Sequence, residues 1–349
     1  MSNFLPQKEF NAKIRVVGIG GAGGNAINRM ISLGLKGVDF IVMNTDVQAL
    51  KKNKAREKVQ LGPETTGGLG AGSDPVIGEK SAQESASVIR DVLTGSNLVF
   101  ITCGMGGGTG TGGAPIVAEI ARELNALVVA VVSRPFNFEG SKRLYIAECG
   151  INKIKDLVDS LIIVVNDRVL HLSEEKLTML EAFKKVDEVL YHGVAGITEM
   201  ITEPSLVNVD FNDTKNILTG SGIAHMGIGT GKGENAAREA VEKAIKSPLL
   251  ETAIRGSNRV MFYVKGDENL KMNDVDMIGN TIRDEAHREA LIIFGANISK
   301  KLKDRVQVTV VASEMSNKDT ALPPKNRSLF RFSKIQDIEV PKFLNQKDE

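Results

Sequence analysis

The sequence predicts an α/β protein that has a Rossmann-like parallel sheet, then a long helix, then a smaller α+β domain. Short apolar runs alternate with amphipathic helical patterns through the first half, as expected of βαβ units. Apolar residues then recur at helical spacing over residues 177–202. Shorter strand-like runs follow, and apolar periodicity stops at residue 316. At 349 residues, and about 150 per domain, the chain is long enough for two domains.

Apolar runs in the first half are predicted to be buried parallel strands. They are residues 14–17, 40–43, 98–102, 127–132 and 161–165. Right-handed crossovers bring the carboxyl ends of such strands to one edge of the sheet, where ligands bind in open α/β folds. The polar or glycine-rich segments that follow each strand are therefore expected to lie close together.

Residues 103–115 read CGMGGGTGTGGAP and contain the densest glycine run in the chain. With seven glycines in residues 104–113, we expect a loop whose bare N–H groups can approach an anion. Pro115 suits the first residue of the next helix. A helix N-terminus next to such a loop is a typical phosphate-binding site.

A second glycine run, residues 18–25, follows the first predicted strand. Gly18, Gly20 and Gly23 match the G-x-G-x-x-G pattern of dinucleotide-binding proteins, and Asp46 follows the next strand. A dinucleotide-dependent oxidoreductase is therefore an alternative interpretation. Two glycine runs, however, suit a longer phosphate chain, and neither has the spacing of a P-loop with its lysine.

The second half is predicted to be α+β. Residues 177–202 form one long helix or two nearly continuous ones, with Gly193 and Gly196 weakening the middle, and the helical pattern ends at Glu203–Pro204. Further helices are expected at residues 234–246 and 275–285, and strands at 224–230, 260–264, 291–294 and 306–312. The last strand alternates like one with a single buried face.

Composition limits the function further. The net charge is +1, which gives no electrostatic signal for nucleic acid. Two cysteines and four scattered histidines show no metal-ligand spacing, so no metal site on side chains is expected. No apolar run reaches the roughly 18 residues of a membrane span, and no signal peptide is recognised. We therefore expect a cytoplasmic protein without direct membrane insertion.

The C-terminal part changes in character. Residues 316–334 have five basic residues and one acid, together with proline and polar residues, a composition typical of a flexible linker. Residues 337–344 then read DIEVPKFL, a short apolar segment of the kind that binds a groove on a partner.

Taken together, the motifs resemble the FtsZ family of the tubulin superfamily. The matching segments, in order, are GGAGGN at 20–25, NTD at 44–46, GLGAG at 68–72, GGGTGTG at 106–112, RPFNFEG at 134–140 and NVDFND at 208–213. GGGTGTG is the superfamily signature and is highly specific. The resemblance runs from about residue 12 to 313 and resumes in the tail.

The resemblance implies that GTP or GDP contacts both glycine runs and further side chains. The implied residues are Gly20, Gly21, Ala22, Gly23, Gly24 and Asn25; Gly106, Gly107, Gly108, Thr109, Gly110 and Thr111; and Glu139, Arg143, Asn166, Phe183 and Asp187. The first run would hold the α- and β-phosphates and the second the β- and γ-phosphates. Mg²⁺ would be bound mainly through phosphates and water.

Some of the implied nucleotide contacts also have a structural interpretation that needs no nucleotide. Glu139 and Arg143 stand four apart and look like the ribose and phosphate contacts of the family, or else form a surface ion pair. Phe183 would stack on the base, although without the resemblance it would be a core residue. Asp187 would accept hydrogen bonds from guanine N1–H and the N2 amino group, with Asn166 adding a polar contact.

Three residues are implied in catalysis: Asn208, Asp210 and Asp213. By local chemistry alone, Asp210 or Asn212 caps a helix and Asp213 complements its dipole. The resemblance implies instead that this loop reaches the nucleotide of the next subunit and that its carboxylates orient the attacking water. Hydrolysis would then need head-to-tail contact, which builds a filament. A non-hydrolysing scaffold of the same fold is a further alternative.

The implied function is that of a GTPase that polymerises into the bacterial division ring at mid-cell beneath the inner membrane. Its partners would be itself and division proteins such as the FtsA membrane tether, bound through the tail. The predicted organisation is an N-terminal extension at 1–12, a GTP-binding domain at 13–176, a central helix at 177–203, an α+β domain with the catalytic loop at 204–315, a linker at 316–334 and a partner-binding tail at 335–349.

Overall fold

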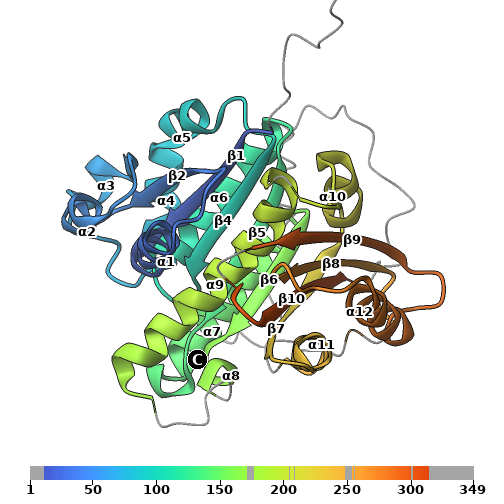
Figure 1. The fold of residues 1–349 in the computed structure, drawn as a ribbon. Helices are drawn as coiled ribbons and strands as arrows, with labels where there is room; N and C mark the ends of the chain where they lie inside the picture. The colour runs from blue at the N-terminus through green and yellow to red at the C-terminus, as the bar shows by residue number, and fades with distance from the viewer. Residues whose placement is uncertain are drawn as a thin grey trace, which may run out of the picture. The chain divides into compact units, whose positions relative to one another are not determined.

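The computed structural model describes residues 12–170, 177–203, 205–207, 209–247, 254, 256–299 and 302–313. Within these residues the strands form one ten-stranded sheet with the order β3-β2-β1-β4-β5-β6-β7-β10-β8-β9 (Figure 1). The predicted N-terminal extension up to residue 11, Asn208, and the predicted linker and tail lie outside the described residues. No helix in the described part is long and apolar enough to cross a membrane.

The first half of the sheet is parallel throughout. Its strands are β1 (Ile14–Ile19), β2 (Asp39–Asn44), β3 (Glu57–Gln60), β4 (Leu98–Gly104), β5 (Leu127–Arg134) and β6 (Ser160–Val165). Five of these confirm the predicted apolar runs. The edge strand β3 reads EKVQ and buries only Val59, so it carries no apolar run by which it could have been predicted.

Helices cover both faces of this parallel sheet. They are α1 (Gly20–Leu33), α2 (Val47–Lys52), α3 (Pro63–Thr66), α4 (Pro75–Glu84), α5 (Ala86–Leu93), α6 (Thr109–Glu123), α7 (Ser141–Ile154) and α8 (Asn166–Val169), with a 3₁₀ turn η1 (Asn137–Glu139). Because side chains alternate along a strand, Val16 faces α1 and the central helix, while Val17 faces α5, α6 and α7. The sheet therefore contributes to two separate hydrophobic cores.

The glycine runs are more helical than predicted. Residues 104–113 were expected to form a loop ending at Pro115, but α6 begins at Thr109 and Pro115 is its seventh residue. A Cβ on Gly112 would overlap the carbonyl oxygen of Pro75, so this glycine allows α4 to pack closely on α6. The second glycine run, at residues 18–25, is also largely helical, because α1 begins at Gly20.

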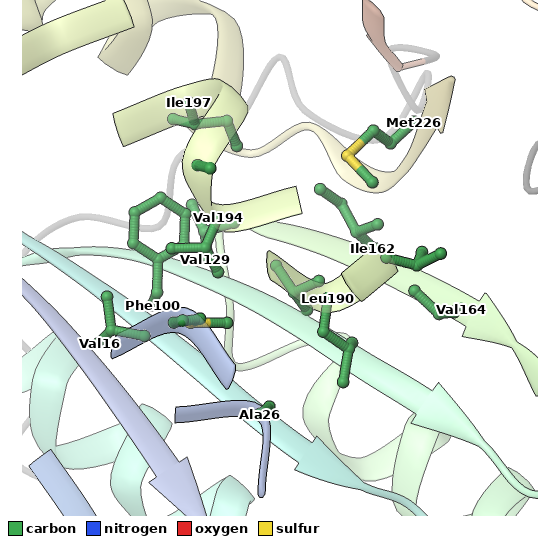
Figure 2. Packing of buried hydrophobic residues seen from close by; sticks show 14 of the residues in the cluster. Val16, Ala26, Phe100, Val129, Ile162, Val164, Leu190, Val194, Ile197 and Met226 are labelled. Carbon is green, nitrogen blue, oxygen red and sulfur yellow. The ribbon is translucent and has the colours of Figure 1, made fainter. Parts of the chain in front are cut away.

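The central helix α9 (Met179–Thr202) is one continuous helix, so the alternative of two nearly continuous helices is wrong. Thr178 caps its N-terminus by accepting the Glu181 N–H at 3.3 Å, and Glu181 accepts a hydrogen bond from the Thr178 N–H at 2.8 Å. Leu190 and Val194 pack in the cluster that contains Val129 and Ile162 of the sheet (Figure 2). Burial against the sheet therefore fixes the position of α9.

The second half follows α9 and continues the same sheet. It consists of α10 (Phe211–Leu218), β7 (Gly222–Lys232), α11 (Ala236–Ile245), β8 (Arg259–Gly266), α12 (Met272–Glu285), β9 (Leu291–Ile298) and β10 (Arg305–Ser313). Residues 222–224 of β7 pair with 160–162 of β6 in parallel, so the two halves are joined by hydrogen bonds. The domain boundaries given above remain a prediction.

Strand β10 corrects one expectation. It was predicted to have one buried face, but Val308 and Val310 lie in the core beneath α11 and α12, while Val311 lies in the core beneath α9. Thr309, on the α9 side, is also buried, and a Cβ on Gly196 would lie 2.7 Å from its methyl group. Both faces of β10 are covered because α11 and α12 pack on one face and α9 packs on the other.

Candidate nucleotide-binding site

A cavity of about 400 Å³ opens at the carboxyl ends of β1, β4, β5 and β6, with α9 along one wall. Most of the predicted nucleotide contacts line it. These are Gly20, Gly21, Ala22, Asn25, Gly107, Gly108, Thr109, Gly110, Glu139, Arg143, Asn166, Phe183 and Asp187. Residues from segments far apart in the sequence therefore meet at the edge of the sheet where parallel strands end.

Four predicted contacts are not part of the cavity wall: Gly23, Gly24, Gly106 and Thr111. A Cβ on Gly23 would overlap the Thr102 carbonyl oxygen, so this glycine lets α1 pack on β4. Thr111 is buried and its Oγ1 accepts a hydrogen bond from the Gly106 N–H at 2.9 Å. Gly23 and Thr111 therefore support the cavity wall without lining it in the described structure: Gly23 allows close packing of α1, and Thr111 holds the Gly106 backbone.

Two helices, α1 and α6, begin at the cavity. Neither N-terminus has a side-chain cap, and neither has an acidic residue in its first turn. The first N–H groups of a helix have no partner inside the helix, and they carry the positive end of its dipole. Gly20 has φ +72°, and a Cβ there would lie 3.1 Å from the Gly110 backbone nitrogen. The two N-termini therefore lie close together and form an environment suited to an anion.

Glu139 and Arg143 form an ion pair at the cavity, with Nη1 2.8 Å from Oε2. The other carboxylate oxygen of Glu139 accepts the Phe136 N–H at 2.9 Å. The Glu139 side chain is only 12% exposed, whereas the Arg143 side chain is 51% exposed. The predicted ion pair is therefore confirmed, but Glu139 is held in the cavity wall while Arg143 remains accessible.

Phe183 and Asp187 lie on the same face of α9 and both line the cavity. Phe183 stands edge-on to Phe136 at a centroid distance of 5.3 Å, yet 38% of it is exposed, so the alternative of a core residue is wrong. Burial raises the pKa of Asp187 to about 6, and the nearby charge of Arg29 opposes this shift. This carboxylate forms no hydrogen bond or ion pair with the described residues.

Asn166 begins α8 directly after β6 and is 5% exposed. Its Oδ1 atom is buried and has no hydrogen-bond partner in the described structure. Buried polar atoms are normally hydrogen-bonded, so one that lines a cavity indicates a site for a polar ligand. The unpaired Asn166 amide oxygen and Asp187 carboxylate therefore mark one end of the cavity as complementary to hydrogen-bond donors.

Sequence reasoning missed several residues of the wall, including Ser133, Val186 and Leu190. Ser133 lies near the end of β5, where the parallel sheet already predicted a site. Val186 and Leu190 share a helical face with Phe183 and Asp187, since Val186 stands three residues after Phe183 and Leu190 stands three residues after Asp187. Helical spacing from Phe183 could have identified both.

Asp210 and Asp213 lie elsewhere, at the start of α10, and neither lines the cavity. Asp210 is the N-cap, one of the two candidates that local chemistry allowed, while Asn212 lies inside α10 and Asp213 is in its first turn. From Asp187 to the end of α9 the chain rises by about 22 Å, at about 1.5 Å per residue. Figure 1 shows α10 beyond this end of α9. The two acids are therefore remote from the cavity of their own chain.

Comparison with known proteins identifies the family. Residues 13–174 match the GTPase domain of the tubulin/FtsZ family, and residues 222–316 match the C-terminal domain of the FtsZ family. An FtsZ from M. jannaschii, described as an empty dimer, is 41% identical, with a TM-score of 0.84 over 93% of this chain and 95% of that chain. A point mutant of FtsZ from M. jannaschii is 42% identical, with a TM-score of 0.83 over 87% of this chain and 91% of that chain.

A more distant structure shares the fold. CetZ2 from Haloferax volcanii, described as a GTPγS-bound protofilament, is 20% identical, with a TM-score of 0.75 over 88% of this chain and 94% of that chain. The family match leaves the dinucleotide-dependent oxidoreductase without support. By these matches and by its fold, the chain belongs to the FtsZ family and carries the GTPase domain of the tubulin/FtsZ superfamily.

Proposed function

We propose that this chain binds GTP in the cavity, assembles head-to-tail, and hydrolyses GTP with acids supplied by the neighbouring subunit. One observation carries the proposal. The only acid among the described cavity residues near the two helix N-termini, Glu139, is already paired with Arg143, whereas Asp210 and Asp213 lie beyond the far end of α9. A second copy would bring its Asp210 and Asp213 to the cavity and so complete the site. Such a head-to-tail interface repeats without closing and therefore builds a filament.

The cavity suggests an orientation for the nucleotide. The phosphates would lie at the N-termini of α1 and α6, where backbone N–H groups are available. Glu139 and Arg143 would contact the ribose and a phosphate. Phe183 would contact the face of the base, and Asp187 would accept hydrogen bonds from guanine N1–H and N2, with Asn166 beside it. Adenine cannot donate this pair of hydrogen bonds, which gives a reason for preferring GTP.

Mg²⁺ fits this site mainly through the phosphates and water. Among the described residues, no group of three or more His, Cys, Asp or Glu side chains is placed to hold a metal ion by itself. The ion would neutralise phosphate charge. Asp210 and Asp213 of the next subunit, with Asn208, would hold the attacking water by accepting its hydrogen bonds.

The proposed biological role is a cytoskeletal filament that forms the division ring at mid-cell, in the cytoplasm beneath the membrane. Similarity to FtsZ at 41% and 42% identity favours this role over that of CetZ, at 20% identity. The description of one FtsZ relative as a dimer supports self-association. A membrane tether of the FtsA type, bound by residues 335–349, is the proposed link to the membrane.

The experiment is sedimentation combined with phosphate release, each measured with GTP, with ATP and without nucleotide. Pelleting and phosphate release that both require GTP support the proposal. Assembly with GTP but without phosphate release would indicate a non-hydrolysing scaffold. Equal responses to GTP and ATP would contradict the proposed role of Asp187.

A further inference from the structure

Next to Asp187, where the nucleotide base is proposed to bind, a cluster of charged side chains joins α1 and α9. The proposed function does not use this cluster. Arg29 of α1 donates from Nη2 to the Glu188 carboxylate of α9. Lys185, one turn earlier on α9, lies 3.3 Å from the other Glu188 oxygen. Glu188 is adjacent in sequence to Asp187, but only Asp187 lines the cavity. Two neighbouring carboxylates therefore lie near a single guanidinium.

The two carboxylates are in different electrostatic states. Burial opposes ionisation of Glu188, but the hydrogen bond from Arg29 and the charge of Lys185 hold its pKa below the usual value. Asp187 has only the longer-range charge of Arg29 to offset its own burial, and its pKa is raised. Glu188 therefore holds the guanidinium, while Asp187 remains unpaired.

Arg29 has the means to pair with Asp187 instead. Its Nε is buried and has no hydrogen-bond partner in the described part of the chain, so the guanidinium has an unused donor. Its charge already acts on Asp187. Arginine can bind a carboxylate through two parallel hydrogen bonds, which would occupy both oxygens of Asp187. Those are the oxygens that the proposed guanine contact requires.

Resting on the proposed function, we propose that Glu188 is a specificity-determining positioning residue, which holds Arg29 away from Asp187 and so keeps the Asp187 carboxylate available to guanine. Without the negative charge at position 188, Arg29 turns to Asp187, the adjacent carboxylate on which its charge already acts. The base must then compete with an internal cation. The nucleotide affinity that depends on Asp187 falls, although Glu188 itself does not contact the nucleotide.

The test is equilibrium binding of GDP and of inosine diphosphate, which lacks the N2 amino group, to the full chain. Glu188→Gln is expected to weaken GDP binding about tenfold, since a hydrogen bond to a charged group contributes about 1.5 kcal/mol or more. The preference for GDP over inosine diphosphate is expected to shrink toward one. The double variant Arg29→Gln/Glu188→Gln removes the competing cation and is expected to regain the GDP preference.

Controls separate this inference from a structural effect and from the proposed function. Lys185→Gln removes a partner of Glu188 but leaves Arg29 held, so GDP preference should persist. If the Arg29–Glu188 pair acts only by tying α1 to α9, the double variant will bind no better than Glu188→Gln, which overturns the inference. If Asp187→Asn leaves the GDP preference unchanged, the proposed guanine contact itself fails. If Asp187→Asn abolishes the preference and Glu188→Gln does not, only the role of Glu188 fails.

Discussion

The Asp210 carboxylate accepts a hydrogen bond from the Asp213 backbone N–H at 2.8 Å, so one of the two proposed catalytic acids holds the backbone of the other. The Asp210 carbonyl also accepts the first backbone bond of α10, from the Thr214 N–H at 3.2 Å. Asp210 therefore combines a structural role with its proposed chemical one. Asp213 has no such structural bond from its side chain in the described residues, and this difference separates the predictions for the two acids.

Replacing Asp213 should stop turnover but not assembly. In Asp213→Ala the helix cap is retained, because Asp210 bonds to the backbone of residue 213 rather than to its side chain. The variant should bind GTP and sediment as filaments, while phosphate release falls to background. Normal phosphate release by this variant would exclude the proposed role of Asp213.

Replacing Asp210 should separate capping from catalysis. Asp210→Ser keeps a side-chain acceptor for the Asp213 N–H, whereas Asp210→Ala does not. The alanine variant is therefore expected to be about 1 kcal/mol less stable to unfolding than the serine variant. Both variants lack the carboxylate and should lose most GTP turnover. If the serine variant kept full turnover, the carboxylate at this position would have no chemical role.

Guanine binding should depend on pH through Asp187. Its pKa is about 6 in the empty protein, so protons compete with guanine below that pH. GDP affinity is expected to be full above about pH 7 and to fall toward about tenfold per pH unit below about pH 6. Asp187→Asn cannot ionise there, and the part of the pH dependence due to this carboxyl should vanish. Identical pH profiles for the two proteins would contradict the prediction.

Alanine substitution should change the stability of the protein differently at two neighbouring glycines of α6. A Cβ on Gly112 would overlap the backbone of α4, whereas a Cβ on Gly113 would lie 3.5 Å from the Ile19 side chain, an ordinary contact. Gly112→Ala is expected to destabilise the protein by about 2 kcal/mol or more. Gly113→Ala should be neutral or stabilise it by up to about 1 kcal/mol, because alanine favours helix. Denaturant unfolding of both variants provides the measurement.

The sequence predicted the fold best where a buried element carries a run or a regular spacing of apolar residues. Buried parallel strands are apolar on both faces, so five strands of the first half could be read directly, and α9 could be read from its helical spacing. Strand β3 could not, since it is a short edge strand with charged residues. The glycines of α6 were misread because sequence does not distinguish a glycine needed for a turn from one needed for close packing.

The candidate site was predictable in part for the same reason. Residues at strand ends meet because of the topology, so the two glycine runs and Asn166 could be expected at one edge. The pairing of Arg29 with Glu188 could not be expected, because it joins residues 159 positions apart on two helices. The unpaired Oδ1 atom of Asn166 likewise depends on how neighbouring side chains pack, which no local pattern records.

In the proposed filament, one subunit holds the nucleotide and the next supplies the acids. The most direct test is GTP turnover per chain, measured over a dilution series together with sedimentation at each concentration. Turnover per chain is expected to fall to near background as filaments disappear. Turnover that stays constant at dilutions where only monomers remain would show instead that each subunit contains a complete catalytic site.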